Sequence, residues 1–174
     1  MSRLRRIAIQ DRIFFVTTNL ANGVAPLSPT ERDLVLNALN ALRGPHRFLI
    51  LGYVIMPDHT HLLLASTEES VSQIMHQWKF KTGFAILKAR GNRGSLWQPR
   101  YFDFICRRNR DVSNKLQYIH ENPVEAGLAR SGIDWRWSSA AYYANTGTSP
   151  VVPDQMDFSG DPDELLWPAP WRRR

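Results

Sequence analysis

The chain has 174 residues, of which 43% are hydrophobic, and this is enough for one domain with a substantial core. A single cysteine, Cys106, excludes an internal disulfide and a cysteine-cluster metal site, and no apolar run approaches the ~20 residues of a membrane span. The net charge of +6 favours a polyanionic partner, and we expect a soluble cytoplasmic protein.

The N-terminal third of the chain predicts a strand followed by a capped helix. Residues 12–18 are β-branched and aromatic, which is typical of a strand. Ser28, Pro29 and Glu31 mark a helix start, because serine can cap, proline fits the first helical position and glutamate completes a capping box. The apolar periodicity, which includes Leu42, carries this helix to Gly44-Pro45.

Two hairpin strands and a second helix follow. The nearly all-apolar run 47–56 predicts a strand buried on both faces. Pro57-Asp58 forms a tight turn, after which residues 61–65 return as the hairpin partner. An apolar stripe at helical spacing predicts a helix over residues 70–90.

The remaining elements complete an α+β fold. Residues 100–106 predict a strand, residues 110–122 a helix that Pro123 ends, and residues 139–145 a short helix. The order β-α-β-β-α-β followed by a helix is the ferredoxin-like pattern, an antiparallel sheet with helices on one face. The C-terminal helix over 110–122 carries Tyr118.

The composition changes near residue 146. Residues 146–174 are rich in proline and aspartate, which is typical of a segment that does not build a core. We therefore expect a domain over residues 1–145 and a flexible tail over residues 146–174.

His59 and His61 flank Thr60 at the start of the predicted return strand. Residues i and i+2 of a strand project from the same face, a geometry that lets two imidazoles bind one metal ion. Two histidines that are simply hydrogen-bonded at a strand end are the structural alternative, and the pair alone does not separate the two interpretations.

Tyr118 and Asn122 are four residues apart on a predicted helix and therefore share a face. An amide oxygen is an acceptable ligand for a hard metal ion, and a tyrosine one turn away would lie near whatever that ion binds. A core tyrosine and a helix-terminal asparagine before proline are the structural alternatives. Asp103 is a further candidate, as a group that orients one of the histidines.

A basic stretch with interleaved aromatics predicts a nucleic-acid surface, with an ordinary solvated basic face as the alternative. It is joined by an arginine arm at the N-terminus, which could enter a groove of a nucleic-acid stem. The residues that we expect to contact DNA are Arg3, Arg5, Arg6, Lys79, Lys81, Trp97, Arg100, Arg107, Arg108 and Arg110.

Four blocks, in order, resemble those of the REP-associated tyrosine transposases, single-tyrosine members of the superfamily named for its His-hydrophobic-His motif. The chain departs mildly from the family pattern at Asp58, where asparagine is usual, and at Thr60, where a large hydrophobic residue is usual. The blocks are Tyr53-Val-Ile-Met-Pro-Asp-His-Thr-His-Leu-Leu-Leu64, Leu96-Trp-Gln-Pro-Arg-Tyr-Phe-Asp103, Tyr118-Ile-His-Glu-Asn-Pro-Val-Glu-Ala-Gly127 and Asp134-Trp-Arg-Trp-Ser-Ser139.

The resemblance implies cleavage and joining of single-stranded DNA at palindromic repeat hairpins, without ATP. It implies that Tyr118 is the nucleophile and forms a 5′-phosphotyrosine, and that His59, His61 and Asn122 bind Mg²⁺ or Mn²⁺. It also implies a protein associated with the nucleoid; we expect a monomer, with a dimer as the alternative. Two other functions stay open: a domesticated protein that binds hairpins without cleaving them, and a metal-dependent RNA nuclease.

Overall fold

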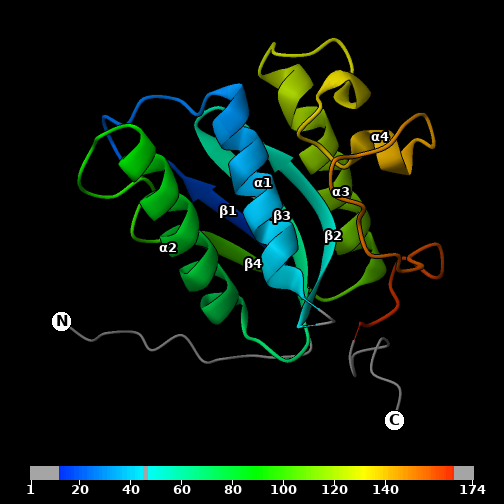
Figure 1. Cartoon of the computed structure of the whole chain (residues 1–174). Coiled ribbons are helices and arrows are strands. Elements are labelled where there is room, and N and C mark those ends of the chain that lie inside the picture. Colours follow the sequence, from blue (N-terminus) through cyan, green and yellow to red (C-terminus); the bar gives the residue numbers. More distant parts are fainter. Residues whose placement is uncertain (1–11, 45–46, 167–174) are drawn as a thin grey trace.

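The computed structural model describes residues 12–44 and 47–166, which form a four-stranded antiparallel sheet with helices on both faces (Figure 1). The strands lie in the order β2-β3-β1-β4, with α1 and α2 side by side across one face and α3 on the other. The predicted α+β ferredoxin-like arrangement is thus confirmed. The elements are β1 (Arg12–Asn19), α1 (Pro29–Arg43), β2 (Phe48–Ile55), β3 (His59–Ser66), α2 (Val71–Ala89), β4 (Phe102–Cys106), α3 (Asn109–Glu125), the 3-10 turn η1 (Gly132–Asp134) and α4 (Ala140–Tyr143).

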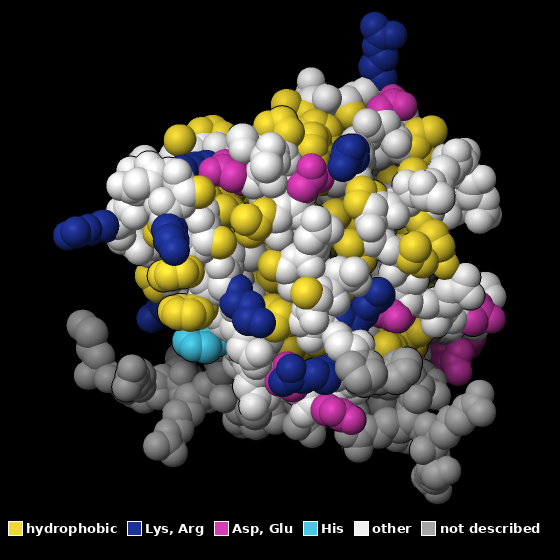
Figure 2. Space-filling view, viewed as in Figure 1, with side chains coloured by type: hydrophobic (Ala, Val, Ile, Leu, Met, Phe, Trp, Pro, Cys, Tyr) yellow, Lys and Arg dark blue, Asp and Glu magenta, His cyan; other side chains and the backbone are white. Residues whose placement is uncertain are grey.

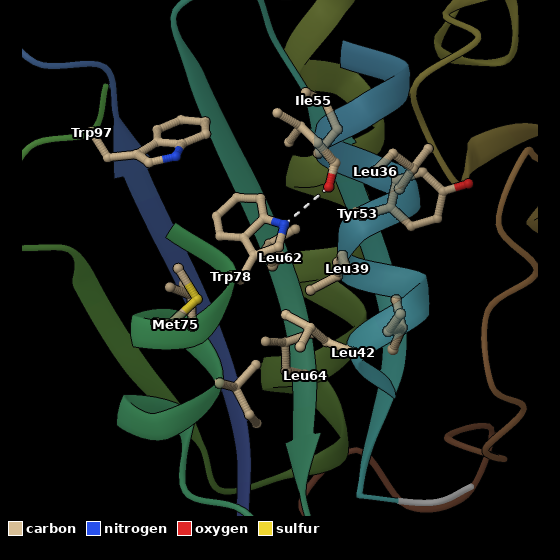
Figure 3. Close-up of a cluster of buried hydrophobic side chains, with 14 of the residues drawn as sticks. Leu36, Leu39, Leu42, Tyr53, Ile55, Leu62, Leu64, Met75, Trp78 and Trp97 are labelled. Atoms are coloured by element: carbon tan, nitrogen blue, oxygen red, sulfur yellow. Dashed lines mark hydrogen bonds between the residues drawn. The ribbon is translucent and has the colours of Figure 1, made fainter. Parts of the chain in front are cut away.

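The larger core lies between the sheet and the α1/α2 pair (Figure 3). Leu62 and Leu64 of β3 point into it, where they meet Leu39 of α1 and Trp78 of α2, all fully buried. The indole Nε1 of Trp78 donates to the Val35 carbonyl at 2.9 Å, so its one polar atom is paired inside an apolar environment. This core therefore joins both helices to the sheet.

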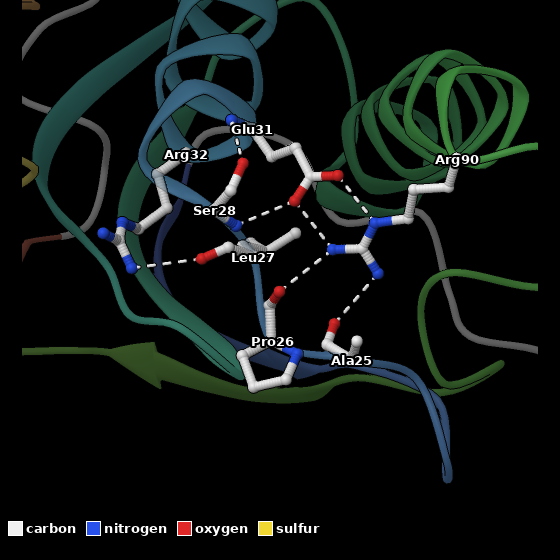
Figure 4. Close-up of polar contacts among 7 residues, drawn as sticks. All are labelled: Ala25, Pro26, Leu27, Ser28, Glu31, Arg32 and Arg90. Atoms are coloured by element: carbon white, nitrogen blue, oxygen red, sulfur yellow. Dashed lines mark hydrogen bonds and ion pairs between the residues drawn. The ribbon is translucent and has the colours of Figure 1, made fainter.

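The start of α1 is fixed by the predicted capping box and by an ion pair to α2 (Figure 4). Glu31 accepts from the Ser28 backbone N–H at 2.7 Å and from Arg90 Nε at 2.6 Å. Arg90 also donates to the carbonyls of Ala25 and Pro26, both at 3.0 Å. The bidentate arginine holds the pKa of Glu31 near 2, below its usual 4.5, and ties together the loop, α1 and α2.

The second face of the sheet carries a smaller core under α3. β2 has a bulge between Ile50 and Gly52, so its inward-facing residues change phase at that point. A Cβ on Gly52 would lie 2.5 Å from Leu116 Cδ2, so the missing side chain lets α3 approach β2 closely. The bulge and the glycine together set the position of the helix that carries Tyr118.

The end of α3 differs from the expectation. The sequence predicts that Pro123 ends the helix, but the helix continues to Glu125. The proline lacks an N–H, yet the turn beyond it is held by Ala126 N–H on the Asn122 carbonyl at 3.0 Å. Gly127, with φ of 70°, then ends the helix in the left-handed conformation that glycine adopts freely.

The described part of the predicted tail, residues 146–166, lies on the domain instead of standing apart from it. Asp154 accepts from the Ile50 backbone N–H at 2.8 Å and pairs with Arg43 at 3.2 Å. Val151 is 2% exposed, and its carbonyl accepts from the Tyr53 hydroxyl at 2.8 Å. The sequence could not reveal these contacts because they are made by single side chains with no periodic pattern.

None of the described helices is long and apolar enough to cross a membrane.

Candidate active site

The two histidines lie at the start of β3, directly after the β2–β3 turn. Alternation along β3 places Thr60 and Leu62 on the α1/α2 side and His59, His61 and Leu63 on the α3 side. The turn is anchored because the Asp58 carbonyl accepts from Leu20 N–H at 2.8 Å. The predicted shared face is confirmed, with the two imidazole centroids 4.8 Å apart.

α3 brings Tyr118 and Asn122 to the same point. The Tyr118 ring lies 5.1 Å from the His61 ring, and the residue is 41% exposed, so part of the side chain is accessible from solvent. Asn122 is 8% exposed, with Oδ1 3.1 Å from His59 Nε2 and Nδ2 3.4 Å from His61 Nε2. The four residues singled out in the sequence therefore meet in one chain, although the two histidines lie more than fifty positions before Tyr118 and Asn122.

Each histidine is oriented through its other ring nitrogen. His61 Nδ1 is 2.8 Å from Thr17 Oγ1, and His59 Nδ1 is 2.7 Å from Asp58 Oδ1. Thr17 and Asp58 thus occupy the orienting positions for which the sequence suggested Asp103. Burial, and then the nearby His59 and Lys115, lower the pKa of His61 from 6.5 to about 3, so this imidazole is neutral at pH 7.

The donor set fits a divalent metal ion. His59 Nδ1 faces Asp58 Oδ1, which leaves Nε2 as the ring nitrogen that faces the Asn122 oxygen, 3.1 Å away. An imidazole nitrogen and an amide oxygen that converge in this way are ligand types that a divalent cation accepts. Among the described residues no three His, Cys, Asp or Glu side chains cluster as a metal site, so an amide is the third protein donor available here.

Two neighbours of the site were not identified from the sequence as parts of it. Lys115 Nζ lies 4.5 Å from the centre of the Phe15 ring and 5.9 Å from that of Tyr118. Phe15 stacks on His61 with ring centroids 5.4 Å apart. The spacing of Lys115 and Tyr118, three apart on one helix, could have indicated the lysine, whereas Phe15 and Thr17 required knowledge of the strand register.

Comparison with known proteins decides the family. The family described as "Transposase IS200 like" matches residues 30–122, more than half of the chain. The chain belongs to the IS200-like transposase family. Its enzyme class is accordingly that of a transposase, which nicks and joins DNA.

Within this family the chain is similar to REP-associated tyrosine transposases. That of Escherichia coli strain K12 is 28% identical over 162 residues, which cover 91% of this chain and 96% of the relative. A solved structure of a REP-associated tyrosine transposase bound to a REP hairpin matches with a TM-score of 0.69 and 26% identity, covering 94% of this chain and 98% of the other. The part of this chain left outside that structural match is shorter than the tail predicted from the sequence.

The basic residues expected to contact DNA are distributed unevenly in this transposase. Lys81, Arg100 and Arg107 are exposed. Arg108 and Arg110 both pair with Asp163 of the tail segment, at 2.9 and 2.7 Å. The arm residues Arg3, Arg5 and Arg6 lie outside the described residues.

Two further expectations involve buried or tethered side chains. Lys79 Nζ donates to the carbonyls of Gln98 and Pro99, at 2.5 and 3.2 Å, and so holds the segment before β4. Trp97 was expected to contact DNA, but it is 2% exposed and stacks on Trp78 with centroids 5.2 Å apart. Its indole donates to Thr82 Oγ1 at 2.9 Å, so Trp97 is a core residue and cannot stack on a base in this fold.

His120, which the sequence left as a structural residue, indeed lies away from the site. Its Nε2 is 2.9 Å from Ser139 Oγ, and burial lowers its pKa to about 4. It therefore helps to pack α3 against the segment before α4, and it serves below as a control for the site histidines.

Proposed function

We propose that this transposase is a metal-dependent single-stranded DNA endonuclease and strand-transferase that acts on palindromic repeat hairpins through a 5′-phosphotyrosine. The observation that carries the proposal is the meeting of Tyr118 with His59, His61 and Asn122 in one chain. The neighbour bound to a REP hairpin supports the choice of substrate.

Tyr118 is suited to act as the nucleophile. Its ring contacts His61 and Phe15, with centroid distances of 5.1 and 5.8 Å, while the residue stays 41% exposed. In the proposed step the phenol oxygen bonds to phosphorus, the 3′-oxygen leaves, and the phenol proton is released. The phosphodiester is conserved as the tyrosyl ester, so a second 3′-hydroxyl can reverse the step and join strands without ATP.

His59, His61 and Asn122 would hold Mg²⁺ or Mn²⁺. Such an ion polarises a phosphate oxygen and stabilises the charge that develops during transfer. Thr17 and Asp58 fix the rings so that both Nε2 atoms face the amide, and burial keeps His61 neutral for coordination. The ammonium of Lys115, beside the Tyr118 ring, offers a second positive charge to the phosphate.

A monomer is the form that the contacts favour. The outer edge of β2 is covered by its own chain: Ile55 N–H donates to Trp137 O at 2.9 Å, Ser139 N–H to Tyr53 O at 3.0 Å, and Asp154 N–H to Ile50 O at 2.7 Å. A second sheet cannot pair along this edge while these bonds exist. Since Tyr118 reaches its own histidines, no partner copy is needed to complete the site. From the proposed DNA substrate we infer that the protein acts in the cytoplasm, at the nucleoid.

The proposal is tested by a covalent-adduct assay. The protein is mixed with Mn²⁺ and a labelled single-stranded hairpin taken from repeats that flank its own gene, and a denaturing gel reports a shifted, protease-sensitive band. We expect an adduct that is absent with EDTA, with Tyr118→Phe and with His59→Ala, and present with His120→Gln. Cleavage without an adduct that persists in Tyr118→Phe would instead indicate a hydrolytic nuclease, and tight binding with neither product would indicate a domesticated hairpin-binding protein.

A further inference from the structure

A groove separate from the site runs along α2. It lies between α2 and the segment 92–101, and its volume is about 1140 Å³. Its floor is formed by core residues such as Met75, Leu96 and Trp97. Pockets for small molecules usually measure roughly 300–1,000 Å³, so this groove has room for a segment of a polymer.

Two phenylalanines stand exposed on one wall of the groove. Phe80 and Phe84 are 68% and 63% exposed, and their rings are stacked, 6.4 Å apart with planes at 17°. Figure 2 shows hydrophobic side chains next to Lys and Arg side chains on the α2 side of the molecule. Large rings held open to solvent on a rigid helix are unfavourable alone and are typical of a surface that receives a partner.

Among the Lys, Arg, Asp and Glu side chains, those that line the groove are all basic. Its lining includes Lys79, Lys88, Arg93 and Arg100 and no aspartate or glutamate. Lys88 Nζ lies 5.9 Å from the centre of the Phe84 ring, and Lys79 Nζ lies 5.9 Å from that of Tyr101. Flat apolar rings bordered by positive charges match the bases and phosphates of an unpaired nucleic-acid strand. Binding of a protein partner would not require a lining without aspartate or glutamate.

The groove is joined to the strand beside the metal-site histidines. Gln98 N–H donates to the Asn19 carbonyl at 2.9 Å, and Asn19 is the register partner of His59. β4 begins directly after the groove, and its edge exposes Phe102 and Phe104, at 59% and 39%. Lys115, beside Tyr118, also lies over Phe104, at 5.0 Å. An aromatic path therefore leads from the Tyr118 site around β4 to the groove.

We propose that this groove binds the unpaired DNA strand that extends from the cleavage site. Its bases stack on Phe80 and Phe84, and Lys88, Arg93 and Arg100 neutralise its phosphates. This proposal rests on the proposed function in one respect, namely that the bound strand is DNA. Binding of a strand in the groove does not depend on cleavage by Tyr118.

The test measures binding in EDTA, where no cleavage can follow. The probe is a fluorescein-labelled oligothymidylate of about 15 nucleotides, long enough to span several stacking positions, followed by anisotropy at several salt concentrations. We expect Phe80→Ala/Phe84→Ala to bind about 30-fold more weakly or worse, since each of the two lost base stacks weakens binding about fivefold or more. Leu128→Ala and Val152→Ala remove similarly exposed side chains elsewhere and should bind like the wild type.

The cations give an independent readout. Lys88→Gln/Arg93→Gln/Arg100→Gln should reduce the slope of log affinity against log salt by about 2, because each phosphate contact on a single strand contributes about 0.7. The double phenylalanine variant should keep the wild-type slope. Affinity within about twofold of wild type in the phenylalanine variant would overturn the proposal, and so would an unchanged slope in the cation variant.

A second copy of the chain is the competing occupant. Sedimentation velocity separates the two, since loss of self-association in Phe80→Ala/Phe84→Ala with unchanged oligothymidylate binding would assign the groove to a protein contact and overturn the DNA assignment. Failure of the proposed function can be distinguished from failure of this proposal. In the first case the wild type forms no adduct on the repeat hairpin, whatever its affinity for oligothymidylate.

Discussion

The two faces of the sheet carry different kinds of residue, although the same strands build both. On the α1/α2 face, β3 presents Leu62 and Leu64 to a large apolar core. On the α3 face the same strand presents His59 and His61, and the apolar core beneath α3 is smaller. Because alternation separates the two sets, one face can supply most of the stability while the end of the other supports polar groups that cost stability.

Removing a group from the α3 face should affect chemistry far more than folding. We expect His61→Ala to lower adduct formation about 1000-fold or more, since a bound ion contributes several kcal/mol to charge stabilisation. Thr17→Val, which removes the partner of His61 Nδ1, should lower Mn²⁺ affinity by about 10–100-fold. Calorimetric titration of Mn²⁺ checks the second value, with His120→Gln as the control. If His61→Ala, Thr17→Val and His120→Gln lost Mn²⁺ affinity equally, the site histidines would have only a structural role.

Removing a side chain from the α1/α2 face should do the reverse. Leu39 of α1 is fully buried, and Leu39→Ala should lower the free energy of unfolding by about 2–5 kcal/mol with unchanged adduct yield per folded molecule. The matched variant is Ile119→Ala on α3, also fully buried but next to Tyr118 in sequence. It should lower both quantities. Urea unfolding and the adduct assay measure them, and a loss of chemistry in Leu39→Ala would contradict the division between the faces.

The contribution of the Glu31–Arg90 ion pair to stability should depend on pH. Both side chains are about five-sixths buried, at 17% and 15% exposure, and we expect Glu31→Gln to lower the free energy of unfolding by about 1–2 kcal/mol at pH 7. The folded pKa near 2 lies below the unfolded value of 4.5, so the contribution is complete above pH 4.5 and is lost as the pH falls toward 2. Wild type and variant should therefore converge in stability over that window. A constant difference would show that the ion pair is not the cause.

The tail contact on α3 should give the smallest effect. Asp163 pairs with Arg108 and Arg110, and all three side chains are 42–58% exposed, so Asp163→Asn should change the free energy of unfolding by less than about 0.5 kcal/mol. Releasing two arginines should tighten hairpin binding by about twofold to threefold at low salt. Anisotropy with the repeat hairpin measures this, and weaker binding would show that Asp163 positions the arginines for DNA instead of occupying them.

Local patterns predicted the elements well, and they predicted which of the four candidate site residues share a face. Strand alternation placed His59 and His61 on one face, helical spacing did the same for Tyr118 and Asn122, and the capping box fixed the start of α1. These signals are reliable because they depend on neighbours within a few residues along the chain.

Features that depend on distant contacts were not predicted. Trp97 was assigned to DNA because aromatics beside cations look alike whether they are buried or exposed, and only Trp78 and Thr82 decide its position. The composition of the predicted tail did not reveal that Asp154 accepts a hydrogen bond from the Ile50 backbone N–H of β2. Thr17 became a partner of His61 only through the β1–β3 register. In each case a single residue far along the chain determines the outcome.

The most direct test of the account is to identify the residue that carries DNA after cleavage. The adduct formed with Mn²⁺ and the repeat hairpin is digested with nuclease and protease and analysed by mass spectrometry. We expect a nucleotide attached through its 5′-phosphate to the peptide that contains Tyr118, and none in His61→Ala. A nucleotide on another residue, such as Tyr142, would contradict the assignment of this face of the sheet as the catalytic one.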